Sequence, residues 1–426
     1  MSVKLRETCR VCGNPKLIPI LSLGDQYSVG FMDKPDEVTV KAPLDLVLCN
    51  AKDGGCGLLQ LKHTLDHDIL YKKYWYKSGI STTMVKALKG IVDSAEKIIK
   101  LKPGDILIDI GSNDGTLLKQ CLAKGVIKVG FEPSNLWELG VSADTKIIHD
   151  YFNHGSFRKE FGDKKAKIIT SISMFYDLEN PNTFVDDIKK CLDANGLWII
   201  QMNYLGLMLD ENTFDNISHE HLEYYSLLSL KNLLDRHDMD IIDVELNDIN
   251  GGGFMIYITH KNSKAQPFAG GAQRVKDLLN KELKLGFDDK KVYDAFSKRI
   301  SGIKAKLLDF LKTETKAGKT VYIYGASTRG LVVLQYAGIT NKLIPFAIDK
   351  NNDKWGKYIV GTGIKVIPFE EYRKNPPNYL FVLPYHFKKE ITKQEAEFLK
   401  NGGKMIFALP NFEVIDKTYL EKVKGD

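Results

Sequence analysis

The chain has 426 residues and a net charge of +6, from 60 basic and 54 acidic side chains. This length predicts roughly two to three domains, because a single hydrophobic core stops growing at about 250–300 residues. No apolar run approaches the ~20 residues of a membrane span, and no block of like charge indicates a nucleic-acid arm. The N-terminus lacks the apolar core of a signal peptide, so we expect a cytoplasmic protein with reduced thiols.

Four cysteines cluster near the start of the chain. Cys9 and Cys12 have the short Cys-x-x-Cys spacing that lets two sulfurs reach one ion, and Gly13 permits the turn to close. Cys49 and Cys56 form a looser second pair around a Gly-Gly insert. A reducing compartment disfavours disulfides. The pattern predicts a structural zinc site with four sulfur ligands and no open position for water.

An aromatic segment and a polar loop follow the cysteines. The aromatic residues are Tyr71, Tyr74, Trp75 and Tyr76, and the polar loop covers residues 78–81. The aromatic segment is interpreted either as a packed hinge between lobes or, with the polar loop, as a segment that closes over a substrate. An amphipathic helix is expected from there to about Leu101.

Strands and helices alternate between residues 105 and about 260. This alternation predicts a doubly wound α/β sheet with an antiparallel end. The expected strands are Ile106–Ile110, Val126–Glu132, Thr145–His149, Ile168–Met174, Leu197–Gln201, Ile241–Leu246 and Met255–His260.

The first of these strands leads into a glycine loop, Ile108–Leu118, with the sequence Ile-Asp-Ile-Gly-Ser-Asn-Asp-Gly-Thr-Leu-Leu. Gly111 and Gly115 allow bare main chain to approach a nucleoside, and Asp109 supplies a carboxylate beside the loop. Glu132, at the end of the next strand, is placed to bridge two ribose hydroxyls. A turn without a ligand is the alternative.

The spacing of the loop argues against a dinucleotide. Gly-x-Gly-x-x-Gly is absent, and Asp114 would repel a phosphate but tolerate a sulfonium. Acidic-x-Gly-x-x-x-Gly, with small polar residues such as Asn113 between the glycines, resembles the first motif of class I S-adenosylmethionine (SAM) methyltransferases.

A lysine-rich helical connector, about Gly271–Lys316, is expected to be broken near Gly286 and Gly302. A second α/β unit then starts at Thr320, with further strands at Leu343–Ile348, Tyr379–Leu383 and Lys404–Ala408. Its turn Gly325-Ala-Ser-Thr-Arg-Gly330 presents main-chain NH groups, hydroxyls and a guanidinium at a helix N-terminus, which favours an anion such as a diphosphate. A Rossmann-like lobe without a ligand is the alternative.

The segment Phe214–Tyr225 combines two histidines, several carboxylates and two tyrosines. Histidine exchanges protons near neutral pH, so His219 and His221 are candidate general bases, with Glu220 on the opposite side of an extended loop. A structural histidine cluster and a metal site are the alternatives.

Several motifs together resemble the nucleotide-sugar C-methyltransferases of deoxysugar pathways. They are Cys9-x-x-Cys-Gly, Tyr74-Trp-Tyr-Lys-Ser-Gly-Ile-Ser81, Ile110-Gly-Ser-Asn-Asp-Gly-Thr116, Ser218-His-Glu-His-Leu-Glu-Tyr-Tyr-Ser226 and Tyr324-Gly-Ala-Ser-x-x-Gly330. The resemblance covers nearly the whole chain. In that family, a 4-keto sugar loses a proton from the adjacent carbon, and the enolate attacks the methyl group of SAM.

The resemblance implies a role for each matching residue. His221 would be the base, Glu220 its partner and Tyr76 part of the sugar pocket, with His219 and Tyr176 also in the catalytic group. The implied cofactor-binding residues are Asp109, Gly111, Asn113, Gly115, Glu132 and Ser173; the implied substrate-binding residues are Tyr224, Ser327 and Arg329; and the implied zinc ligands are Cys9, Cys12, Cys49 and Cys56.

The chain departs from the family pattern at two places. Ser218 stands where the family has a tyrosine, and Ser173-Met-Phe-Tyr176-Asp177 stands where it has a histidine. Tyr176 or Asp177 is expected to take over the lost polar contacts.

We therefore expect a zinc-binding domain at residues 1–78, a SAM methyltransferase domain at 79–264, and a connector with a Rossmann-like sugar-nucleotide domain at 265–426. The expected partner is a nucleotide sugar, without nucleic acid or membrane, and the expected state is a monomer or weak homodimer. O- or N-methylation of a related sugar, a noncatalytic nucleotide-sugar binder and an RNA-binding module are the alternatives.

Overall fold

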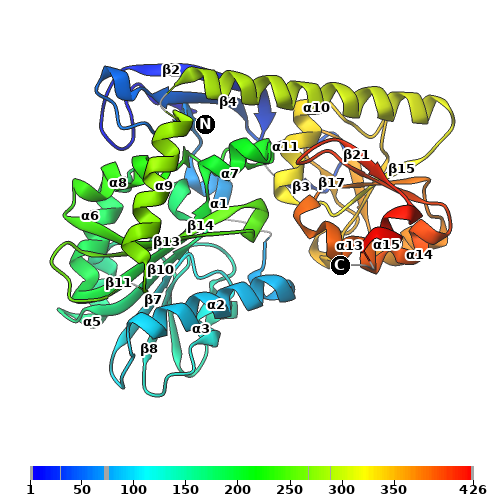
Figure 1. Ribbon diagram of the computed structural model, residues 1–426. Coiled ribbons are helices and arrows are strands. Elements are labelled where there is room, and N and C mark those ends of the chain that lie inside the picture. The colour runs from blue at the N-terminus through cyan, green and yellow to red at the C-terminus, as the bar shows by residue number, and fades with distance from the viewer. Residues whose placement is uncertain (1–2, 29, 72–75, 267, 288, 424–426) are drawn as a thin grey trace.

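The computed structural model describes residues 3–28, 30–71, 76–266, 268–287 and 289–423. Figure 1 shows an N-terminal lobe in blue, a large sheet with helices in green and cyan, and a C-terminal sheet with helices in orange and red. The long helix α10 (Lys290–Lys316) runs along the N-terminal lobe and reaches the C-terminal unit.

The central sheet has seven strands in the order β13-β14-β11-β10-β7-β8-β9. Strands β7 to β11 are parallel, and β14 is antiparallel to both of its neighbours, which confirms the predicted doubly wound sheet with an antiparallel end. The strands are β7 (Ile106–Ile110), β8 (Ile127–Phe131), β9 (Thr145–Ile148), β10 (Ala166–Ile172), β11 (Leu192–Asn203), β13 (Met239–Asn247) and β14 (Gly253–His260).

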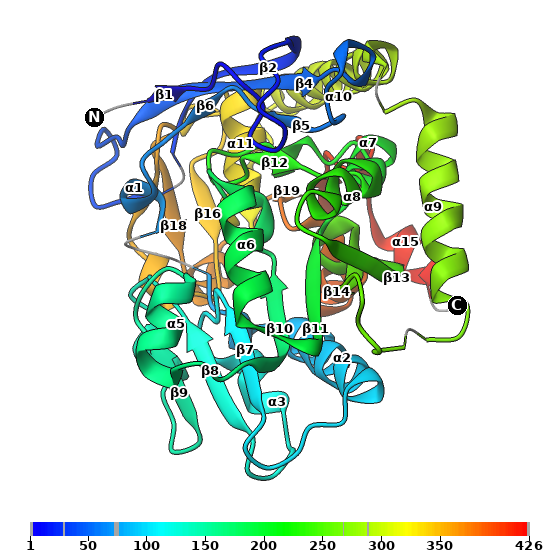
Figure 2. The ribbon, with the colours of Figure 1, turned by 90° about the vertical axis from the view of Figure 1, so that its left-hand side faces the viewer.

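Helices cover both faces of this sheet, because the side chains of a strand point alternately to opposite faces. Ile106, Ile108 and Ile110 pack on the side of α5 (His154–Phe161) and α6 (Pro181–Cys191), which Figure 2 shows together. Leu107 packs on the opposite side. That side is covered by α2 (Thr82–Ile98) and α3 (Thr116–Gln120). The shorter helices of this unit are α4 (Trp137–Gly140), α7 (Leu205–Asp210) and α8 (Leu227–Asp235).

The N-terminal lobe contains a small sheet, β1 (Lys4–Leu5) with β6 (His63–Thr64), and a four-stranded sheet in the order β12-β5-β4-β2. The strands β2 (Leu17–Tyr27), β4 (Lys41–Cys49) and β5 (Leu59–Leu61) come from the lobe itself. The fourth strand, β12 (Glu223–Tyr224), comes from the segment that carries the two candidate histidines. Helix α1 (His67–Tyr71) follows the lobe.

The C-terminal sheet has eight strands in the order β21-β20-β19-β15-β16-β18-β17-β3. Five neighbouring strands from β20 to β18 are parallel, which confirms the Rossmann-like unit. The edge strand β3 (Phe31–Met32) comes from the N-terminal lobe. The others are β15 (Val321–Tyr324), β16 (Phe346–Ile348), β17 (Tyr358–Ile359), β18 (Ile364–Ile367), β19 (Tyr379–Val382), β20 (Lys404–Phe407) and β21 (Glu413–Ile415); the helices are α11 (Thr328–Ala337), α12 (Phe369–Lys374), α13 (Lys388–Gln394), α14 (Ala396–Lys400) and α15 (Lys417–Val423).

The helical connector is broken once. Helix α9 (Gly271–Leu285) ends at Gly286, whose φ of 67° is left-handed, and α10 starts after the N-cap Asp289. The predicted break at Gly302 is wrong, because α10 continues through it. A glycine costs a helix only about 1 kcal/mol, and the buried neighbours Ile300 and Ile303 anchor the helix on both sides.

No helix in the described ranges combines the length and the apolar character needed to cross a membrane.

Candidate active site and metal centre

The four N-terminal cysteines converge. Their sulfur atoms all lie within 4.8 Å of one another, with 3.5 Å between Cys9 and Cys56 and 3.4 Å between Cys12 and Cys49. Zn–S bonds of about 2.3 Å place tetrahedral sulfurs roughly 3.8 Å apart, so the four residues fit a zinc ion. The backbone NH of Cys56 also donates to the Cys49 sulfur at 3.4 Å.

The glycine loop follows β7 in the geometry that the sequence predicts. Gly111 and Gly115 have φ values of 69° and 72°, and Asn113 between them has 53°. Added to Gly115, a Cβ atom would stand 2.7 Å from the Cα of Gly140, so the loop lies directly against the α4 backbone. Only glycine satisfies both the torsion and the contact at position 115.

Two carboxylates border this loop. Glu132 accepts from the backbone NH of Asn113 at 2.7 Å and from that of Ser134 at 2.9 Å, so it fixes the loop by its charge. Asp109 accepts from the Thr170 hydroxyl at 2.7 Å, and burial raises the pKa of Asp109 to about 7.

The polar loop after the aromatic segment lies on the glycine loop. The backbone NH of Ser78 donates to the Asn113 side-chain oxygen at 3.0 Å, and that of Gly79 donates to Asp114 at 2.8 Å. The Asn113 amide donates in turn to the backbone oxygen of Tyr76 at 3.0 Å. Tyr74 and Trp75 lie outside the described residues.

These elements enclose a cavity of about 210 Å³ at the carboxyl ends of β7, β8 and β10. Its wall combines acidic and hydroxyl groups with apolar side chains. This combination suits a nucleoside with an attached charged chain. The lining includes Tyr71, Tyr76, Ser78, Leu88, Asp109, Gly111, Asn113, Phe131, Glu132, Tyr151, Phe152, Ser173 and Asp177.

His221 packs against Tyr176, the residue before Asp177 of the cavity wall. Its Nδ1 lies 2.7 Å from the backbone oxygen of Asn216, and its ring packs edge-on against Tyr176 with 4.4 Å between ring centroids. A carbonyl oxygen only accepts, so Nδ1 carries the proton and the lone pair of the neutral ring lies on Nε2. Burial, together with the positive charge of Arg329, lowers the pKa of His221 to about 4.

Two carboxyl groups flank the histidine. Burial raises the pKa of Glu220 to about 7. Burial and the nearby Glu220 raise the pKa of Asp177 well above its usual range, and Tyr71 hydrogen-bonds to Asp177. The site therefore combines a neutral imidazole with carboxyl groups that favour their protonated form.

Two of the predicted tyrosines line a second small space together with His221. It is bordered by Tyr176, Tyr224, Asn203, Asn216 and His221. The hydroxyl of Tyr224 donates to the backbone oxygen of His221 at 3.0 Å, so this side chain supports the histidine segment from behind.

His219 is not brought to this group. Its Nε2 lies 3.0 Å from the backbone oxygen of Ala42 in β4, and the side chain is 5% exposed. The two histidines are two residues apart, yet His219 faces the N-terminal lobe while His221 faces the methyltransferase domain.

Ser327 and Arg329 of the C-terminal lobe both have hydrogen-bond partners within the protein. The Ser327 hydroxyl caps α11 by accepting from the backbone NH of Gly330 at 3.2 Å. Arg329 crosses to the methyltransferase domain, where its Nη2 lies 2.9 Å from Asp215 Oδ2 and donates to the Tyr385 hydroxyl at 3.2 Å. It therefore joins the C-terminal lobe to the His221 segment. Its predicted contact with a diphosphate stays a prediction.

From the sequence, Asp177 was predicted only to take over polar contacts that the family makes with other residues. Tyr71 was given no catalytic role. The position of Asp177 just after the fourth parallel strand was the available signal, because ligands bind at the carboxyl ends of such strands. Asp215 and Tyr385 carried no signal, since they lie 114 and 56 residues from Arg329 in the sequence.

Comparisons with known proteins cover all three parts. Residues 9–71 match a family described as a putative zinc binding domain, residues 86–244 match a methyltransferase domain, and residues 248–410 match a C-methyltransferase C-terminal domain. The chain is 28% identical over 422 residues to the C-methyltransferase NovU of Streptomyces niveus, covering 96% of this chain and 97% of that protein.

Solved structures with similar folds match only part of the chain. A complex of the Haloferax volcanii Trm112 methyltransferase activator with a methyltransferase matches at 13% identity and a TM-score of 0.33, over 42% of this chain and 95% of that one. The plantazolicin methyltransferase BpumL with bound SAH matches at 14% identity and a TM-score of 0.32, over 42% and 84%.

The sheet, the glycine loop and the matched methyltransferase domain define a class I SAM-dependent methyltransferase. Its zinc-binding and C-terminal domains, and its full-length similarity to NovU, support a SAM-dependent C-methyltransferase. Its cofactors are SAM and a structural zinc ion.

Proposed function

We propose that the chain methylates a carbon next to a ketone in a nucleotide-linked sugar, with His221 as the base. The observation that carries this proposal is the hydrogen bond from His221 Nδ1 to the Asn216 carbonyl, which leaves the lone pair on Nε2. A carbon acid requires a base that stays neutral in a buried site, and the lowered pKa of His221 meets that requirement.

The reaction balances as a proton transfer followed by a methyl transfer. His221 Nε2 takes a proton from the carbon beside the ketone, and the C–H electron pair becomes an enolate. The enolate carbon then forms a bond to the methyl group, and the carbon–sulfur bond breaks with its electrons on sulfur. SAM supplies the electrophilic methyl group when it is bound.

Glu220 is proposed as the donor to the ketone oxygen. Its raised pKa favours the protonated carboxyl group, which can donate a hydrogen bond to a developing enolate. Tyr76 and Asp177, which both line the cavity, are proposed to contact the sugar.

The nucleotide part of the acceptor is assigned to the C-terminal lobe. Support comes from the turn after β15, where Gly325 has a φ of 79° and α11 begins with Ser327 as its N-cap. A cytoplasmic location, a monomer or weak dimer, and domain limits at residues 78 and 264 remain part of the proposal.

The proposal is tested with SAM carrying a ¹³C-methyl group and a panel of nucleoside-diphosphate 4-keto sugars. We expect a ¹³C-methyl signal coupled to a carbon of the sugar ring. A methyl signal at the chemical shift of an O- or N-methyl group would contradict carbon as the acceptor. Turnover of ketones that lack the nucleotide at the same kcat/KM would contradict the nucleotide-linked substrate.

A further inference from the structure

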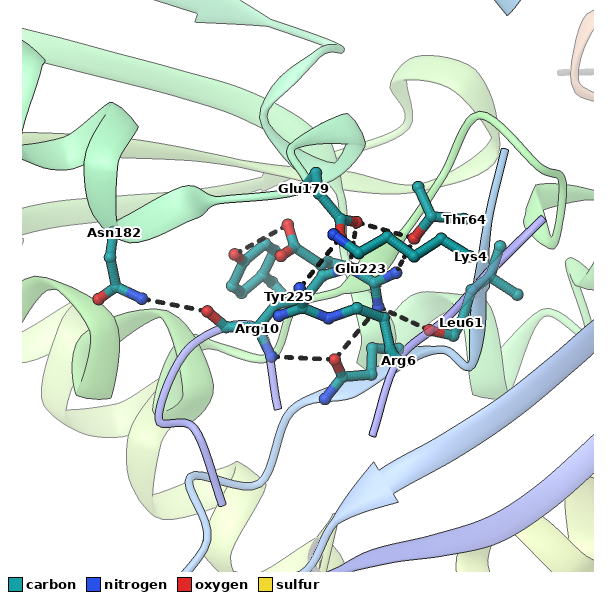
Figure 3. A network of polar contacts seen from close by, with 10 residues as sticks. Lys4, Arg6, Arg10, Leu61, Thr64, Glu179, Asn182, Glu223 and Tyr225 are labelled. Atoms are coloured by element: carbon teal, nitrogen blue, oxygen red, sulfur yellow. Dashed lines mark hydrogen bonds and ion pairs between the residues drawn. The ribbon is translucent and has the colours of Figure 1, made fainter. Parts of the chain in front are cut away.

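Arg10 lies inside the metal knuckle, between the ligands Cys9 and Cys12, and it is 3% exposed. Figure 3 shows its side chain at the centre of a polar network between the N-terminal lobe and the methyltransferase domain. Its Nη1 donates to the backbone oxygen of Leu61 at 2.6 Å, and its Nη2 donates to the Thr64 hydroxyl at 2.6 Å. The guanidinium is therefore fixed against the strands of its own lobe.

The same guanidinium reaches the segment that carries Asp177. Arg10 Nε donates to Glu179, two residues beyond Asp177, at 3.3 Å. Glu179 also pairs with Arg6 at 3.0 Å and with the exposed Lys4 at 3.2 Å. Three cations thus share one carboxylate, and Arg10 is the buried one.

Arg10 also reaches the segment that carries the histidine. Its backbone NH and its Nη1 both donate to the side-chain oxygen of Gln60, at 3.1 and 3.2 Å. Gln60 is the strand partner of Glu223 in the β5–β12 pair. Next to this pair, the backbone NH of Leu61 donates to the backbone oxygen of Leu222 at 2.8 Å.

Arg10 also interacts electrostatically with Glu223, a buried acidic residue of the same segment. Glu223 is 1% exposed, lies two residues beyond His221 and accepts from the Tyr225 hydroxyl at 3.1 Å. Its other carboxyl oxygen has no hydrogen-bond partner within the described ranges. Burial raises the pKa of Glu223 well above its usual range, and the charge of Arg10 opposes that rise.

We propose that Arg10 is a positioning residue that couples the zinc knuckle to both acid–base segments, residues 175–179 and 218–225. The zinc ligands on either side of Arg10 hold its backbone, and its side chain holds the two segments in register with the cavity. Only the naming of His221 as the base rests on the proposed function. The proposed coupling concerns only how well ordered these two segments are, whatever the chemical role of His221.

The test uses the full-length, zinc-loaded protein, with SAM as the only ligand. Backbone amide hydrogen exchange is measured for wild type, Arg10→Met and Arg10→Lys, with zinc content, melting temperature and SAM affinity measured on each. Arg6→Met and Lys4→Met are the matched controls, because they remove a cation from the same Glu179 carboxylate without a contact to Gln60 or Leu61.

We expect Arg10→Met to exchange about tenfold faster or more in both segments, while β7 and β8 stay protected and one zinc remains bound. Arg10→Lys should restore part of the protection, since it keeps the charge. Arg6→Met should affect residues 175–179 alone, and Lys4→Met neither segment. If Arg10→Met unfolds the chain, the comparison of Arg10→Lys with the two controls gives the same test.

A spectroscopic readout separates positioning from general loosening. In the Arg10 variants, the His221 ring should titrate closer to the usual histidine range when followed by NMR of ring-labelled histidine. Unchanged exchange in residues 218–225 together with an unchanged His221 titration would overturn the proposal. Both measurements need no acceptor, so they stay valid if the sugar or the role of His221 is wrong.

Discussion

The groups around the cavity owe their protonation states to burial. His221 is held neutral, with a pKa lowered to about 4, while burial raises the pKa of both Asp109 and Glu220 to about 7. Desolvation acts in opposite directions on the two kinds of group, since it always disfavours the charged form. A neutral base and a neutral acid can therefore coexist near neutral pH without an ion pair between them.

These pKa shifts predict the pH dependence of kcat/KM. The base works only when His221 is unprotonated, so activity is lost as the pH falls through about 4, well below the usual histidine range. The donor works only when Glu220 is protonated, so activity is lost as the pH rises through about 7.

A pH–rate profile of wild type and Glu220→Gln checks this expectation. Glutamine keeps a donor that does not titrate, so the alkaline limb should disappear while the acidic limb stays. An alkaline limb that persists unchanged in Glu220→Gln would assign it to another group.

At the scale of elements, the cofactor site depends on one strand and one loop, whereas the acid–base site depends on pairings between distant segments. Strand β7 and its glycine loop are contiguous in sequence, so their spacing alone predicts them. Strand β12 has only two residues, and it exists because Glu223 and Tyr224 pair with β5 of another lobe. Periodicity cannot reveal a strand of this length.

Replacing Gly115 by alanine should remove the cofactor site without unfolding the protein. The left-handed φ of 72° and the 2.7 Å approach to Gly140 both oppose a side chain, at a cost of about 1–3 kcal/mol. We expect SAM affinity to fall at least about tenfold, which corresponds to 1.4 kcal/mol.

Gly104→Ala is the matched control for this variant. Gly104 has a φ of 89°, but nothing lies within 4 Å of the position where its Cβ would stand. Calorimetry with SAM should therefore show normal affinity for Gly104→Ala. Equal losses in the two variants would mean that backbone strain in general, and not the α4 contact, controls binding.

Much of the fold was predictable from the sequence, because it depends on patterns within short stretches of the chain. The four cysteines, the seven strands of the central sheet and the second α/β unit follow from spacing and periodicity. The orientation of His219 toward β4 and the pairing of Arg329 with Asp215 were not predictable, because each depends on packing between lobes. Gly302 was overinterpreted, since helix packing outweighs a single glycine.

At the scale of the whole molecule, the N-terminal lobe connects the other two parts. It receives β12 from the methyltransferase domain and gives β3 to the C-terminal sheet, and α10 packs along it (Figure 1). The metal centre therefore lies in a lobe that pairs through strands with segments of both larger units.

Removing one zinc ligand should destabilise the whole chain. We expect Cys12→Ser to lose most of its zinc and to lower the melting temperature by several degrees, since structural zinc contributes directly to folding. Cys121→Ala is the control, because Cys121 is buried beside α2 and α3, away from the cluster. Metal analysis and calorimetry measure both effects, and full zinc content in Cys12→Ser would exclude this residue as a ligand.

The central claim is that His221 forms an enolate before the methyl transfer. The most direct measurement is deuterium exchange at the carbon beside the ketone, followed by NMR in D₂O with a nucleoside-diphosphate 4-keto sugar and S-adenosylhomocysteine in place of SAM. Wild type should incorporate deuterium, and His221→Ala should reduce the rate by about 10²–10⁴-fold while its affinity for S-adenosylhomocysteine stays within about twofold. Exchange at the wild-type rate in His221→Ala would contradict the account.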